Sequence, residues 1–111
     1  MARYGQLIRL KREAYGEYVR CHAAVWPGVL QTIRECHIRN YTIFHTVHRG
    51  EGLLFAYFEY VGDDFAADMA RMAADPVTQR WWAIMNPMQE PLETRAAGEW
   101  WTRMQEVFHT E

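Results

Sequence analysis

The spacing of hydrophobic and polar positions divides the chain into segments of different character. Residues 4–10 alternate as in a strand, whereas residues 12–36 place apolar side chains three or four positions apart, as on one face of a helix. Pro27 cannot continue a helix through its own nitrogen, and it moves Trp26 away from helical angles. The first third of the chain therefore predicts a strand and then a helix that breaks or restarts just past His22.

The middle of the chain predicts a β-hairpin. Residues 39–47 and 53–61 are both rich in β-branched and aromatic side chains, with a glycine-containing turn between them. Alternation places Tyr41, Ile43 and His45 together on one face of the first strand. A slip of one residue in the register would turn that face outward, so the direction of Tyr41 depends on the pairing.

The second half of the chain predicts two further helices and a last strand. Asp64 is suited to cap a helix over residues 65–74, and Asp75, which precedes a proline, is suited to cap another through residue 85. Residues 86–98 contain two prolines and predict a loop, whereas residues 99–109 return to strand-like side chains.

This order of elements is β-α-β-β-α-β. It predicts an α+β fold, a ferredoxin-like sandwich with helices over one face of a four-stranded antiparallel sheet. The 111 residues suit a single domain spanning residues 1–111. Because the strands are apolar on both faces, we expect the uncovered face to meet a second copy in a homodimer.

Composition and charge exclude several classes of function. The chain has twelve basic and fourteen acidic residues and no run of basic residues. It therefore lacks the basic patch that would bind nucleic acid or an anionic membrane. No stretch is apolar enough to span a bilayer and the first ten residues lack a signal-peptide core, so a cytoplasmic location is expected. His45 and His48 have no carboxylate at a ligand spacing, and Cys21 lies about 100° around the helix from His22, so we expect neither a metal site nor a nucleophilic thiol.

His22 is the main candidate for chemistry, because it lies where a helix should present apolar side chains. Tyr18 is four residues earlier and shares that face, so the buried stripe carries a hydroxyl and an imidazole. The alternative is a core histidine satisfied by Tyr18 or by a backbone carbonyl. Tyr41 would join the pair if its strand face is the one covered by helices.

Two tryptophans extend this candidate site. Trp81 and Trp82 are adjacent in a predicted helix, about 100° apart, so they cannot share one core position and one of them can line a groove. Their alternative role is core plus interface, as for Trp100 and Trp101. Phenol and indole rings pack on the apolar faces of sugars, while hydroxyl and imidazole groups pair with sugar hydroxyls, so a small neutral carbohydrate fits this set best.

Several segments together resemble the L-rhamnose mutarotase family. They are Tyr-Val-Arg-Cys-His-Ala-Ala-Val-Trp-Pro at residues 18–27, Asn40-Tyr41, Asp75-Pro76, Gln79-Arg80-Trp81-Trp82 and Gln105-Glu106-Val107-Phe108. The resemblance implies a cytoplasmic, cofactor-free dimer of the α/β-barrel type that interconverts the α and β anomers of a 6-deoxy-hexose by acid–base ring opening. It implies His22 as the proton donor, with Tyr18, Tyr41, Trp81 and Trp82 binding the substrate.

Two alternatives remain open at this point. The loop at residues 86–98 does not closely follow the rhamnose enzymes, so L-fucose is a second candidate sugar beside the favoured L-rhamnose. A ligand-binding or oxidative member of the broad dimeric ferredoxin-like group is the other alternative, since fold alone does not determine activity.

Overall fold

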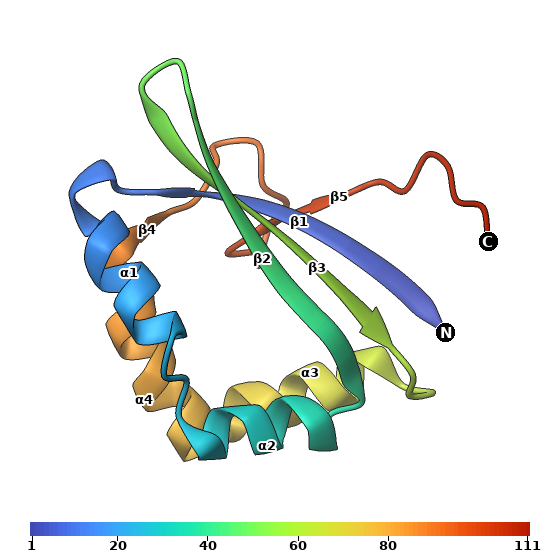
Figure 1. Cartoon of the computed structure of the whole chain (residues 1–111). Helices are drawn as coiled ribbons and strands as arrows, with labels where there is room; N and C mark the ends of the chain where they lie inside the picture. The colour runs from blue at the N-terminus through green and yellow to red at the C-terminus, as the bar shows by residue number, and fades with distance from the viewer.

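The computed structural model describes residues 1–111 and has an α+β architecture (Figure 1). The strands are β1 (Ala2–Leu10), β2 (Ile38–His48), β3 (Glu51–Tyr60), β4 (Gln89–Glu90) and β5 (Thr102–Met104). The α-helices are α1 (Tyr15–His22), α2 (Pro27–Glu35), α3 (Phe65–Ala74) and α4 (Pro76–Met85), with short 3-10 turns at Arg12–Ala14 and Asn86–Met88. The strands form a curled sheet, and all four helices lie on its inner side. None of the helices has the length and apolar character needed to cross a membrane.

The helix boundaries follow the local signals of the sequence. The long N-terminal helix is interrupted as predicted, because α1 ends at His22 and α2 begins at Pro27, the position where a helix tolerates proline. Asp64 and Asp75 cap α3 and α4 by accepting hydrogen bonds from the backbone N–H groups of Ala67 and Thr78. The predicted helices and the predicted hairpin are therefore confirmed.

The sheet has five strands and not the predicted four, in the order β2-β3-β1-β4 with β5 also paired to β1, and every pairing is antiparallel. The outer edge of β1 is shared, since β4 pairs with its end and β5 pairs with its middle. The prediction of a strand over residues 99–109 is therefore wrong in extent, because only Thr102–Met104 is β-structure. Beyond Met104 the chain makes no ladder, and the ion pair between Arg3 and Glu106 holds it beside β1 instead.

A bulge in β2 reverses which side chains face the helices. Ile38 pairs with Tyr60, and Ile43 pairs with Ala56, so an even-numbered and an odd-numbered residue of β2 both meet the inner face of β3. The register shift lies between Arg39 and Thr42, where Asn40 has a φ of 53°. The extra residue shifts the inward–outward alternation of β2 by one position. After the bulge, the odd-numbered side chains of β2 point toward the helices.

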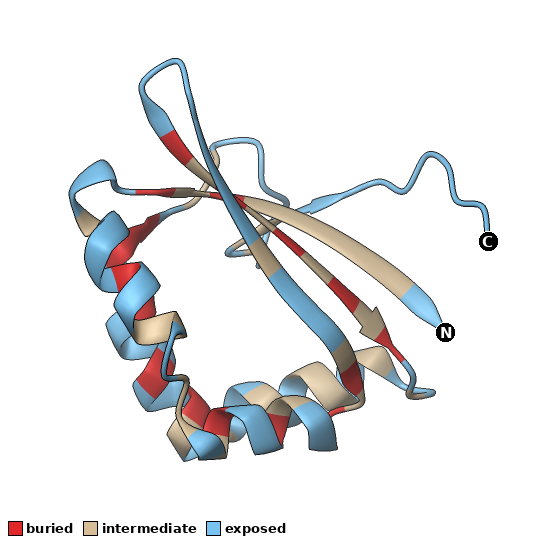
Figure 2. Ribbon diagram, in the orientation of Figure 1, coloured by how far each residue is buried: buried red, intermediate tan, exposed pale blue.

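The buried residues gather along the inner face of the sheet and the facing sides of the helices (Figure 2). One cluster lies under α1 and α4 and consists of Ile8, Leu10, Tyr18, Val29, Leu54, Trp81, Met85 and Met88. A second cluster, Ile38, Phe58 and Tyr60, lies toward α3 and packs against Tyr4 and Phe65. The outer face of the sheet is more open, and Phe44 there is 58% exposed.

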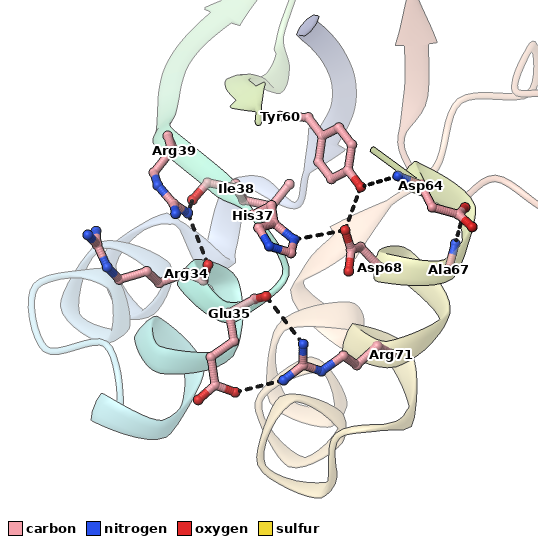
Figure 3. Close-up of polar contacts among 10 residues, drawn as sticks. All are labelled: Arg34, Glu35, His37, Ile38, Arg39, Tyr60, Asp64, Ala67, Asp68 and Arg71. Atoms are coloured by element: carbon pink, nitrogen blue, oxygen red, sulfur yellow. Dashed lines mark hydrogen bonds and ion pairs between the residues drawn. The ribbon is translucent and has the colours of Figure 1, made fainter. Parts of the chain in front are cut away.

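A polar cluster joins α3 to the junction between α2 and β2 (Figure 3). Asp68 accepts hydrogen bonds from the Tyr60 hydroxyl and, at 3.0 Å, from Nδ1 of His37. The Tyr60 oxygen in turn accepts the backbone N–H of Asp64. These bonds, led by the one from Tyr60, hold the pKa of Asp68 below its ordinary value.

Candidate functional site

The last turn of α1 holds His22 in one orientation. Nδ1 of His22 lies 2.8 Å from the backbone carbonyl oxygen of Tyr18, one helical turn earlier. A carbonyl can only accept a hydrogen bond, so Nδ1 carries the proton and Nε2 is the nitrogen left free in the neutral ring. The two side chains also stack, with ring centroids 4.2 Å apart. The predicted face shared by Tyr18 and His22 is present.

The hydroxyl of Tyr18 belongs to a buried residue and is held by a hydrogen bond. Tyr18 is only 4% exposed, and its oxygen accepts a hydrogen bond of 3.0 Å from Nε2 of Gln89. Burial raises the pKa of this phenol to about 12. Tyr18 therefore stays protonated at neutral pH and acts as a hydrogen-bonding group.

Of the two adjacent tryptophans on α4, Trp81 is the one that reaches His22. Trp81 is 6% exposed and makes edge contacts with the rings of His22 and Trp26, at centroid distances of 5.5 Å and 5.2 Å. Trp82 is 37% exposed and makes no ring contact with the others. The structure thus separates the pair into one buried ring and one open ring, as their angular spacing predicted.

Tyr41 lies on the inner face of the sheet, because it follows the bulge at Asn40. Its ring stacks on buried Phe58 with an interplanar angle of 6° and a centroid distance of 5.5 Å. The Tyr41 oxygen lies 3.5 Å from Nε2 of Gln6, which donates to it. Burial of the hydroxyl, and after that the neighbouring Tyr18 hydroxyl, raise the pKa of Tyr41. Part of the ring remains accessible, since the residue is 39% exposed.

The site therefore lies where the two apolar clusters of the inner face meet. Tyr18 and Trp81 belong to the cluster under α1 and α4, whereas Tyr41 stacks on the cluster toward α3. His22 is half-buried beside the first cluster. The arrangement combines one imidazole with two neutral phenols and an indole, so it can exchange a proton at one atom and hold an uncharged polar ligand by hydrogen bonds.

Sequence reasoning missed the two glutamines of this site. Gln89 and Gln6 each donate to a tyrosine oxygen, and Gln89 also accepts a hydrogen bond from the indole N–H of Trp100. Gln89 lies within the predicted loop over residues 86–98, and Gln6 lies within the alternating strand predicted over residues 4–10. A glutamine is ordinary in both settings. The only sequence signal for Gln89 was that its loop departs from the family pattern.

No group of three or more His, Cys, Asp and Glu side chains stands close enough together to hold a metal ion. Trp100 and Trp101 fall in the predicted strand over residues 99–109, and this placement is wrong, since both precede β5. Two surface hollows lie away from His22. One is beside Arg12 and Gly50, and the other is beside Arg103.

Comparison with known proteins identifies relatives over the whole chain. A model of the L-rhamnose mutarotase family matches residues 3–110. The L-rhamnose mutarotase of Lactiplantibacillus plantarum is 33% identical over 111 residues, which cover 100% of both chains. The L-rhamnose mutarotase of Sinorhizobium fredii is 32% identical and covers 89% of this chain and 88% of its own.

A solved structure also matches in fold. The crystal structure of an L-rhamnose mutarotase from Formosa agariphila superposes with a TM-score of 0.75 and covers 100% of both chains. The sequence identity of this pair is 20%, so the likeness speaks for the fold.

Proposed function

The chain belongs to the L-rhamnose mutarotase family, and from this we propose that it interconverts the α and β anomers of L-rhamnose. The observation that carries the proposal is the geometry of His22, whose Nδ1 is engaged by the Tyr18 carbonyl while Nε2 stays free. One nitrogen is thus fixed and the other is available for proton transfer. The enzyme is an isomerase, since substrate and product differ only at the anomeric carbon.

We assign the role of proton donor to His22. In its protonated form His22 gives the Nε2 proton to the ring oxygen of the sugar as the bond between that oxygen and the anomeric carbon breaks. The anomeric hydroxyl loses its proton to water, which leaves an open-chain aldehyde. Rotation of the aldehyde and closure from its other face reverse these steps, and Nε2 regains a proton. No atom is gained or lost, and no oxidation takes place.

The substrate-binding roles belong to Tyr18, Tyr41, Trp81 and Trp82. Because burial raises the pKa of both phenols, their hydroxyls serve as neutral hydrogen-bonding partners for the sugar. Trp81 packs against the imidazole of His22, and the partly exposed ring of Trp82 offers an apolar face to the sugar. Holding the sugar beside Nε2 converts a slow reaction in water into one that proceeds within a fixed geometry.

L-rhamnose is favoured over L-fucose because the curated relatives that match are named L-rhamnose mutarotases. Saturation-transfer NMR on the anomeric protons of both sugars tests this choice. We expect the protein at micromolar concentration to accelerate exchange of L-rhamnose more than that of L-fucose. The reverse order would change the substrate, and failure with every deoxy-hexose would overturn the function.

An oxidative or purely ligand-binding role is distinguished by a different observation. Purified protein with the absorption of bound haem or flavin and without anomer exchange would favour that class. Catalysed exchange by a colourless protein would exclude it. The cytoplasmic location stays a prediction of the sequence.

We further propose that the fold is of the ferredoxin-like, dimeric α/β-barrel type. The strand order β2-β3-β1-β4 supports the ferredoxin-like topology. The outer face of the sheet supports the homodimer, because Phe44 and Phe55 stack there with Phe44 more than half exposed. Light scattering at micromolar concentration should give twice the chain mass, and a monomeric mass would contradict the dimer.

A further inference from the structure

Gln89 is a buried amide that connects two parts of the site. It is 6% exposed, and it pairs in the sheet with Leu10, a buried residue of the inner face, so its side chain points inward. Nε2 of Gln89 lies 3.0 Å from the Tyr18 hydroxyl, and Oε1 lies 2.8 Å from Nε1 of Trp100. Both polar atoms of this amide are therefore in use.

The indole of Trp100 determines which way the amide is turned. An indole N–H can only donate a hydrogen bond, so the atom of Gln89 that faces it must be the oxygen. The NH₂ group must then face Tyr18, and it can only donate. The hydroxyl oxygen of Tyr18 is thereby used as an acceptor, and no hydrogen bond within the chain uses the proton of that hydroxyl.

We infer that Gln89 is a positioning residue that orients the Tyr18 hydroxyl as a hydrogen-bond donor to the sugar. This inference rests on the proposed function, because it assigns the ligand of Tyr18. The ring oxygen of a pyranose can only accept a hydrogen bond, as can the lone pairs of its hydroxyls, so a committed donor discriminates between poses of the sugar.

The substitution Gln89→Glu reverses this polarity with almost no change in shape. A carboxylate can only accept hydrogen bonds, so it accepts one from the Tyr18 hydroxyl. That hydroxyl then has only its lone pairs left, and it acts as an acceptor toward the sugar. Trp100→Phe is a second variant at a partly exposed ring, where loss of the N–H lets the amide turn over. Gln105→Glu, at an exposed glutamine near the end of the chain, is the matched control for charge.

We expect Gln89→Glu to raise the KM for L-rhamnose by about tenfold, with kcat changed less than about twofold, because a hydrogen bond made in both ground state and transition state is lost. Trp100→Phe should raise KM by a smaller factor, and Gln105→Glu should leave both constants unchanged. In Tyr18→Phe protein, addition of Gln89→Glu should have no further effect on KM. Unchanged KM in folded Gln89→Glu and Trp100→Phe protein, even with a lower Tm, would reduce Gln89 to a structural role and overturn the inference.

A second measurement needs no sugar. In ¹⁵N-labelled protein, Tyr18→Phe should shift the side-chain amide protons of Gln89, and Gln89→Leu should shift the indole proton of Trp100. If neither resonance moves, the amide is not held between these groups and the inference fails. If the resonances move but the wild-type protein exchanges no deoxy-hexose, the orientation of Tyr18 stands and the proposed function has failed.

Discussion

Nδ1 of His22 and the backbone carbonyl oxygen of Tyr18 are 2.8 Å apart, joined across one turn of α1. This bond assigns the two ring nitrogens different tasks. Nδ1, bonded to the carbonyl, holds the ring in place, and Nε2 is the nitrogen that is free to take up and give a proton.

His22→Ala should therefore lower catalysed anomer exchange by about 10²–10⁴-fold, the usual contribution of one general acid–base group. Sugar affinity should change much less, since Tyr18, Tyr41 and the tryptophans remain. Saturation-transfer NMR, sugar titration and thermal unfolding on the same sample measure the three quantities. His48→Ala, an exposed histidine at the end of β2, is the matched control. A core histidine without a chemical role would instead lower Tm and leave the rate per folded molecule unchanged.

The two adjacent tryptophans should respond differently to truncation. Trp81→Ala removes a ring buried against His22 and Trp26, so we expect a loss of about 3–5 kcal/mol in the free energy of unfolding. Trp82→Ala should cost far less stability, and it should weaken sugar binding by up to about tenfold through loss of an apolar ring face. Chemical denaturation and sugar titration separate the effects. Equal stability losses with normal affinity in both variants would count against a binding role for Trp82.

The bulge in β2 should be sensitive to the residue at position 40. Asn40 has a φ of 53°, a conformation that asparagine and glycine adopt and that β-branched residues avoid. Asn40→Val should cost about 1–3 kcal/mol of stability, because it combines backbone strain with loss of the hydrogen bond to Glu59. Asn40→Gly, which loses the same hydrogen bond without the strain, is the control and should cost less. Equal losses in the two variants would show that the backbone conformation carries no strain.

The polar cluster around Asp68 should make stability depend on acid. The Tyr60 and His37 hydrogen bonds lower the pKa of Asp68 in the folded state. A carboxyl whose pKa is lower when folded contributes stability above its unfolded pKa of about 4, and that contribution is lost as the pH falls through the folded pKa. The difference in Tm between wild type and Asp68→Asn should thus be largest near neutral pH and shrink below about pH 4.

Asp63→Asn serves as the control for this titration, because Asp63 is exposed and its side chain makes none of the hydrogen bonds of the cluster. Its Tm should follow that of wild type across the same range. A difference between wild type and Asp68→Asn that stays constant down to pH 2 would contradict the assignment of the acid dependence to this carboxyl.

Much of the local structure could be predicted from the sequence because its causes act within a few residues. Pro27 starts α2 and holds Trp26 before it in an extended conformation, and Asp64 and Asp75 cap helices by bonds to residues three positions on. The shared face of Tyr18 and His22 follows from the helical repeat alone. The family resemblance likewise rested on short motifs, and the match over residues 3–110 confirmed it.

Strand pairing and contacts between distant residues were decided by the tertiary structure. The bulge at Asn40 gave Tyr41 its inward direction, and it depends on how β2 pairs with β3. The last strand is only three residues long, and it pairs with Gly5–Leu7 of β1, while β4 pairs with Arg9 and Leu10 of the same edge. Gln89 meets Tyr18 across 71 residues of sequence. Hydrophobic periodicity states which side chains are buried, but sheet register and curl determine which buried side chains meet, and those are properties of the whole folded chain.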